Sequence, residues 1–149
     1  MKLKNILVPV DFSHSSSRVL KTAVDLAGAM DAKIHLLHVE EDVYRIRQGH
    51  ALSVMDRELV PIIDNFHATL LRECGVKLAA LLKKLPDHLR GDAVTVEGHP
   101  TEVILTYIDE HNIDLEIVGK RGQSDIAGHS LGSTTEKIAR KASCSVLIV

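Results

Sequence analysis

Five short apolar runs alternate with four helical patterns along this chain, and this alternation restricts the fold more than any other feature. The predicted strands are 5–10, 33–39, 93–97, 115–118 and 146–149, and the predicted helices are 13–30, 61–85, 100–112 and 133–142. A connection between parallel strands needs a crossover, which a helix supplies. We therefore expect a single α/β domain over residues 1–149, a parallel sheet with helices on both faces.

The segment between the second and third predicted strands shows a helical pattern only in its second part. Residues 40–60 show mixed charges and no clear period, whereas apolar residues from Ile62 to Leu85 recur at helical spacing. Proline is tolerated in the first turn of a helix and damaging deeper in it, so Pro61 predicts either a helix start or a kink. Pro86 should end this long amphipathic helix.

Composition excludes several kinds of partner. With 149 residues, of which 45% are apolar and 26% charged, the chain can bury a full core. A net charge of -2 offers no broad basic field for nucleic acid or an anionic membrane. The apolar run before Asp11 is too short for a signal peptide or membrane span, and Cys74 and Cys144 form no metal or redox motif. We expect a cytoplasmic protein with no nucleic-acid or membrane partner.

The stretch after the fourth strand has the spacing of a phosphate-binding loop. The strand ends at Gly119, Gly122 follows, and nine residues separate Gly122 from Gly132, after which hydroxyl side chains open a helix. Glycine allows backbone N–H groups to approach an anion, and a helix N-terminus supplies unpaired N–H groups. The alternative is structural: the glycines make turns, and Ser133 forms a capping box with Glu136.

A second strand end carries polar chemistry. Asp11 stands just past the first strand. Ligands of open α/β sheets bind beyond the carboxyl ends of the strands, where the strand order reverses. If the first and fourth strands are neighbours, Asp11 and Gly119 face one crevice.

Four motifs coincide with those of a known family. The chain reads G-K-R-G, nine residues, then G-S; it opens with I-L-V-P-V-D-F-S, continues with L-L-H-V-E, and ends with C-S-V-L-I-V, where Ser145 replaces a usual proline. Along nearly its whole length the chain resembles the ATP-binding branch of the universal stress protein family. The resemblance implies a Rossmann-like sheet of five parallel strands in the order 3-2-1-4-5.

The resemblance also implies a ligand and its contacts. The ligand is ATP or another adenine nucleotide, with Asp11 beside the ribose or adenine and able to reach Mg²⁺ through water. The base lies against the first two strand ends, and the phosphates lie against the glycines and hydroxyls. The implied nucleotide-binding residues are Pro9, Val10, Asp11, Val39, Val118, Gly119, Gly122, Gly132, Ser133, Thr134 and Thr135. A homodimer through the C-terminal strand 146–149 is also implied, since an apolar edge strand invites pairing.

Three functions follow from this interpretation. The first is an ATP-binding sensor or regulatory module in a stress response. The second is a slow ATPase or self-phosphorylating enzyme, although the sequence shows no acid–base pair or nucleophile triad, and we therefore expect weak turnover at most. The third is an interaction protein without nucleotide, which the glycine motif argues against.

Several residues depart from the pattern. Lys120 and Arg121 either attract phosphate or are solvated loop cations. Glu116 lies within a predicted strand and needs either an exposed edge or a cationic partner. His35 and His38, three apart in a strand, face opposite sides of the sheet and cannot readily share an ion. We therefore expect no metal site built from protein side chains, apart from the water-mediated role of Asp11.

Overall fold

A computed structural model describes residues 3–41, 59–122 and 131–149, and a parallel sheet lies at the centre of the fold. The strands are β1 (Asn5–Pro9), β2 (Lys33–Glu40), β3 (Arg90–Glu97), β4 (Leu115–Val118) and β5 (Ser145–Ile148). The helices are α1 (Ser16–Met30), α3 (Val60–Lys84), the short 3₁₀ helix η2 (Asp87–Leu89), α4 (Pro100–Glu110) and α5 (Ser133–Lys141). The strand order β3-β2-β1-β4-β5, with every pair parallel, confirms the predicted topology.

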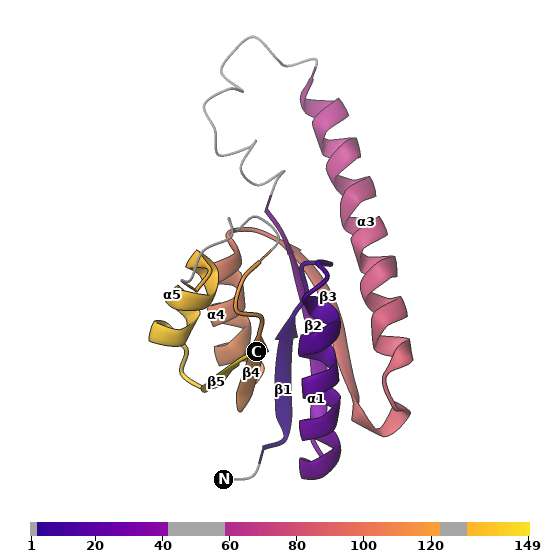
Figure 1. Cartoon of the computed structure of the whole chain (residues 1–149). Helices are drawn as coiled ribbons and strands as arrows, with labels where there is room; N and C mark the ends of the chain where they lie inside the picture. The colour runs from indigo at the N-terminus through magenta and orange to yellow at the C-terminus, as the bar shows by residue number, and fades with distance from the viewer. Residues whose placement is uncertain (1–2, 42–58, 123–130) are drawn as a thin grey trace.

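The sheet separates two hydrophobic cores. Helices α1 and α3 cover one face, where Val19 and Ala23 of α1 pack with Leu78 of α3 (Figure 1). Helices α4 and α5 cover the other face, where Ile104 and Ile138 pack together. Alternate residues of each strand serve the two cores, as the two-residue period of a strand requires.

Proline fixes the ends of α3 as predicted. Pro61 lies in the first turn, where its missing N–H costs no helical hydrogen bond, and the helix ends before Leu85 and Pro86. The other boundaries shift slightly: β1 stops before Val10, and β3 begins at Arg90 rather than at position 93. Residues 42–58, which gave no clear pattern, lie outside the described part of the chain.

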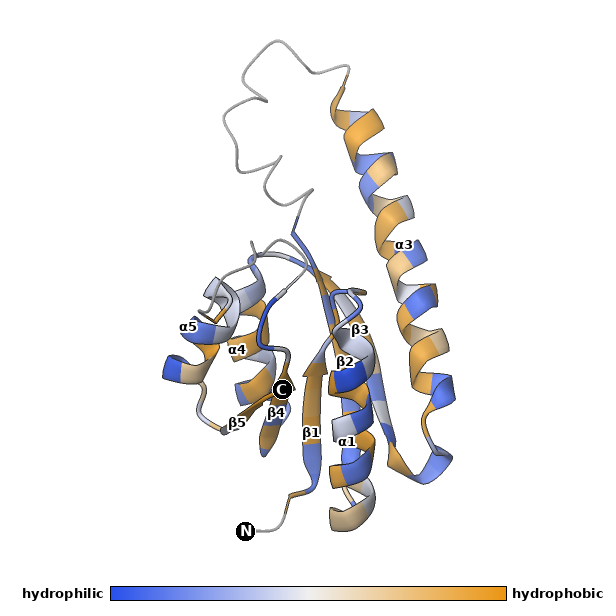
Figure 2. Ribbon diagram, in the orientation of Figure 1, coloured by the Kyte–Doolittle hydropathy of each residue, from blue (hydrophilic) through white to orange (hydrophobic). Residues whose placement is uncertain are grey.

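The N-terminal part of α3 extends past the sheet (Figures 1 and 2). Ile62 is 64% exposed and Phe66 is 60% exposed, so these two residues of the amphipathic pattern are not part of the core. The buried residues of α3 are His67, Cys74 and Leu78, which face β2 and β3. Even α3, at 25 residues, lacks the sustained apolar character of a membrane-spanning helix, and no other described helix has it.

Glu116 has neither of the environments that its sequence context suggested. The side chain is 0% exposed, and neither carboxyl oxygen has a hydrogen-bond partner among the described residues. Leu115 and Ile117 pack on the α1 side of β4, so Glu116 points toward α4 and α5. Burial raises the pKa of Glu116 to about 8, so the carboxyl is mostly protonated at neutral pH. The fold therefore accepts this residue as a neutral acid.

Candidate functional site

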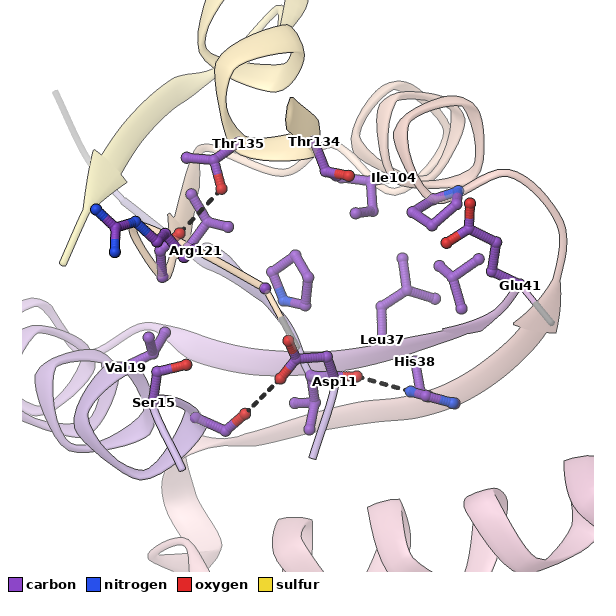
Figure 3. Close-up of a pocket in the computed structure, with 18 of the residues that line it drawn as sticks. Asp11, Ser15, Val19, Leu37, His38, Glu41, Ile104, Arg121, Thr134 and Thr135 are labelled. Carbon is purple, nitrogen blue, oxygen red and sulfur yellow. Dashed lines mark hydrogen bonds between the residues drawn. The ribbon is translucent and has the colours of Figure 1, made fainter. Parts of the chain in front are cut away.

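A cavity of about 500 Å³ opens at the carboxyl edge of the sheet (Figure 3). The ends of β1, β2 and β4 form its floor, and α1, α4 and α5 contribute residues from their N-terminal parts. Its volume lies in the range of about 300–1,000 Å³ that is usual for small-molecule sites. The strand order reverses between β1 and β4, so the cavity lies where open α/β sheets bind ligands.

Most residues predicted for the site line this cavity. Ten of the eleven do so: Pro9, Val10, Asp11, Val39, Val118, Gly119, Gly122, Ser133, Thr134 and Thr135. The eleventh, Gly132, is a buried residue that forms the N-cap of α5, and its N–H donates to the carbonyl oxygen of Lys120 at 2.9 Å. Gly132 thus holds the start of α5 near the end of β4.

The first turn of α5 has no capping box. Ser133 is the first helical residue, the N-cap Gly132 makes no side-chain cap bond, and Glu136 instead accepts from Arg140 at 3.0 Å. The capping-box alternative is therefore wrong. Ser133 and Thr134 line the cavity beside the early N–H groups of the helix, which have no acceptor within it. This end of the cavity suits an anion.

The side chain of Thr135 makes a hydrogen bond within the protein. Its hydroxyl donates to the carbonyl oxygen of Gly119 at 2.9 Å, and its side chain is buried (Figure 3). This bond joins the end of β4 to the first turn of α5. Gly119 and the N-terminus of α5 are thereby held together at one side of the cavity.

Asp11 both stabilises a turn and lines the cavity. Its Oδ1 accepts from the backbone N–H of Ser13 at 2.9 Å and from the hydroxyl of Ser16 at 3.1 Å. These bonds stabilise the turn that leads into α1. The same side chain lines the cavity beside β1 (Figure 3).

The packing of the protein around Gly119 does not by itself require a glycine at this position. A Cβ at this position would meet the carbonyl oxygen of Arg121 at 3.4 Å, Val19 Cγ2 at 3.6 Å and Ser15 Oγ at 3.7 Å. These are ordinary van der Waals distances. A side chain as small as alanine therefore fits at this position, and close backbone approach to a ligand stays a prediction.

The cavity is electrostatically polar. Arg121 and Glu41 lie at opposite ends of it (Figure 3). A second cavity shares Arg121 and Gly122 with the first and adds Arg18 and Lys120. The two loop cations therefore differ, because Arg121 lines the main cavity and Lys120 lines only the neighbouring one. The positive end continues outward from the α5 N-terminus.

Sequence reasoning missed part of the wall. The additional lining residues are Ser15, Ser16, Val19, Leu37, His38, Glu40, Glu41, Pro100, Ile104 and Arg121, of which only Arg121 was considered for ligand contact. A signal existed for Pro100, because it opens α4 directly after β3, whose carboxyl end lies at the same edge of the sheet. Ile104 follows one turn later on that helix.

The two histidines of β2 face opposite sides, as predicted. His38 lies on the α3 side, and its Nδ1 is 2.7 Å from the carbonyl oxygen of Val10. On the α4 side, Nδ1 of His35 is 3.2 Å from Oδ2 of Asp92. Burial lowers the pKa of His35, and Asp92 opposes this shift.

Comparison with known proteins gives consistent relationships. The chain matches the universal stress protein family over residues 2–149. It is 30% identical to universal stress protein YxiE of Bacillus subtilis over 148 residues, with 97% of each chain covered. The solved structure of protein MJ0577 of Methanocaldococcus jannaschii superimposes with a TM-score of 0.81 at 24% identity, covering 100% of this chain and 96% of that one. A universal stress protein solved in complex with cAMP is 26% identical, with a TM-score of 0.57 and coverage of 100% and 98%. The chain therefore belongs to the universal stress protein family.

Proposed function

We propose that this protein binds an adenine nucleotide, with ATP as the preferred ligand, and acts as a sensor or regulatory module in a stress response. One observation carries the proposal. The ends of β1 and β2, the glycines Gly119 and Gly122 after β4, and the first turn of α5 line one cavity of about 500 Å³. A similar protein solved with cAMP supports an adenine nucleotide as the class of ligand.

The polarity of the cavity supports one orientation of the nucleotide. The phosphates lie at the α5 N-terminus, near Ser133, Thr134 and Arg121, where N–H groups, hydroxyls and a guanidinium can donate to them. The base lies toward Val39 and Glu41, where a carboxylate can accept from its amino group. The ribose would lie beside Asp11, whose carboxylate could hold Mg²⁺ through water.

Binding without efficient turnover fits the chemistry of Asp11. Its Oδ1 already holds the turn into α1 through Ser13 and Ser16, a structural task for the carboxylate nearest the proposed ribose. General-base catalysis requires a base placed to take a proton from the attacking water. We therefore propose a regulatory role rather than a catalytic one, in the cytoplasm, where the unpaired Cys74 and Cys144 are expected to stay reduced.

We also propose a homodimer through β5. This strand lies at the end of the sheet order and pairs with β4 on one side, and its apolar residues Val146, Leu147 and Ile148 are only half-buried. An apolar edge strand is a template for pairing with a second chain. Sedimentation velocity should show a dimer that persists on dilution.

The decisive experiment identifies what the purified protein holds. Denaturing it and analysing the released small molecules by mass should yield an adenine nucleotide. Adding ATP–Mg²⁺ should raise the Tm, because the stabilisation grows with the logarithm of one plus the ratio of ligand concentration to Kd, and GTP should raise it less. The proposal fails if no adenine nucleotide is released and ATP–Mg²⁺ leaves the Tm unchanged. Phosphate release from ATP is also measured for the wild type and for Asp11→Asn. Equal rates for the two proteins would separately exclude the enzymatic alternative.

A further inference from the structure

Three side chains of metal-ligating chemistry meet between β2 and α3. The ligand atoms of His38, Glu40 and Cys74 all lie within 4.8 Å of one another. We propose that these residues form a site for a divalent transition metal, with Zn²⁺ as the best match. A set of one imidazole nitrogen, one carboxylate oxygen and one thiolate sulfur is typical of zinc.

The fold explains why these residues meet. His38 and Glu40 are two apart on β2, so both project from the same face of the strand, toward α3. Cys74 belongs to the buried stripe of α3, which packs on that face. Glu40 is 7% exposed and Cys74 is 6% exposed, so this is an interior cluster and not a group of surface acids.

A hydrogen bond presets the imidazole for metal binding. Nδ1 of His38 is 2.7 Å from the carbonyl oxygen of Val10, and a carbonyl oxygen can only accept. Nδ1 therefore carries the proton, and Nε2 keeps the lone pair that a metal needs. Metal-binding histidines commonly have their second ring nitrogen bonded in this way, because the bond fixes the tautomer and the ring orientation.

The distances require only a small adjustment. Zinc binds these donors at about 2.0–2.3 Å, which places tetrahedral ligands roughly 3.3–3.8 Å apart. Ligand atoms that now lie within 4.8 Å of one another need to approach by at most about 1–1.5 Å. Binding releases the thiol proton of Cys74 to solvent, and the resulting thiolate and the carboxylate of Glu40 balance the charge of the ion.

The site would tie the long helix α3 to the sheet next to the nucleotide cavity. His38 and Glu40 also line that cavity, on the side of β2. Three protein ligands leave a fourth position for water or an incoming group. The metal would require no nucleotide, so this inference does not depend on the proposed function.

Cobalt spectroscopy tests the site without nucleotide. Metal-free full-length protein is titrated with Co²⁺, and thiolate ligation should give a charge-transfer band in the near ultraviolet. Only two cysteines are present, so the Cys144→Ser variant should keep the band and Cys74→Ser should lose it. Absence of the band in Cys144→Ser overturns the proposal, even if Cys74→Ser does not fold.

Zinc affinity provides the second readout. In competition with a chromophoric chelator, His38→Ala and Glu40→Gln should each weaken Zn²⁺ binding by at least the roughly 10–100-fold that loss of an outer-shell partner costs. The exposed His88→Ala is the matched control and should bind as the wild type does. Wild-type affinity in folded Cys74→Ser, checked by circular dichroism, also overturns the proposal.

Discussion

The hydroxyl of Thr135 donates a 2.9 Å hydrogen bond to the carbonyl oxygen of Gly119, joining two segments that are 16 residues apart in the chain. Both residues were expected to contact a ligand. In the structure, the hydroxyl of Thr135 is engaged within the protein and its side chain is 3% exposed. The hydroxyl of Thr135 therefore ties Gly119 to the first turn of α5.

Replacing Thr135 by valine should destabilise the protein. The substitution keeps the shape of the side chain and leaves the carbonyl oxygen of Gly119 without its donor, which typically costs about 1–3 kcal/mol. Urea unfolding measures the loss, with Thr106→Val on the exposed side of α4 as the control. Equal stability of the two variants would show that the bond contributes little.

Glu116 should make stability fall as pH rises. The pKa of this carboxyl is raised from 4.5 to about 8 in the fold, so between these values the folded state binds more protons than the unfolded state. The free energy of unfolding should then decrease by roughly 1.4 kcal/mol per pH unit at most. The stability that depends on protonated Glu116 is lost once the pH passes about 8.

Urea titrations across this window should show the slope in the wild type and a much flatter profile in Glu116→Gln, because an amide stays neutral at every pH. The exposed Glu110→Gln serves as the control and should keep the wild-type slope. An unchanged slope in Glu116→Gln would mean that another group causes the pH dependence.

A methyl group at Gly119 should separate binding from folding. The nearest atoms to its Cβ lie at 3.4 Å or more, so Gly119→Ala should fold with little change in Tm. Nucleotide affinity, measured by calorimetry, should drop at least tenfold, about 1.4 kcal/mol, because the methyl group blocks backbone approach. In the control Gly28→Ala, where the Cβ meets nothing within 4 Å, affinity should stay constant and helix α1 should gain up to about 1 kcal/mol.

The cations of the neighbouring cavity should favour longer phosphate chains. Arg18 and Lys120 lie beyond Arg121, outside the main cavity. Replacing both by glutamine should weaken ATP binding several-fold and leave AMP binding nearly unchanged, and added salt should shrink the difference. Equal losses for the two nucleotides would place the terminal phosphates elsewhere.

The strands were predictable because their signals are local, whereas the strand order and most residues of the cavity, Val39 among them, came from the resemblance to a known family. Each apolar run marks one strand, and the spacing from Gly119 to Gly132 marks the loop that follows β4. The carboxyl ends of parallel strands meet at one edge of a sheet, so Asp11 and Gly119 were predicted to face one crevice if the first and fourth strands were neighbours, and in the structure they are. The capping box was not predictable in the same way, because Gly132 and Ser133 can each serve as an N-cap.

The remaining features depend on contacts between distant segments. The sequence cannot show that Glu116 faces a covered side of β4, since α4 and α5 must first be placed. Cys74 follows Glu40 by 34 residues, so their proximity arises from how α3 lies on β2. The exposure of Phe66 likewise reflects the length by which α3 exceeds the sheet.

The central position of β1 has a consequence for synthesis on the ribosome. One of its two neighbours in the sheet, β4, begins only at Leu115. Just before β4, the carboxylate of Asp114 accepts from the backbone N–H groups of Lys4 at 2.7 Å and Asn5 at 2.9 Å. At roughly 5–20 residues per second, β4 emerges several seconds after β2. During that interval the nascent chain can pair β1 with β2, and later β2 with β3, but the β4 side of β1 stays an open apolar edge that is available to chaperones and to aggregation.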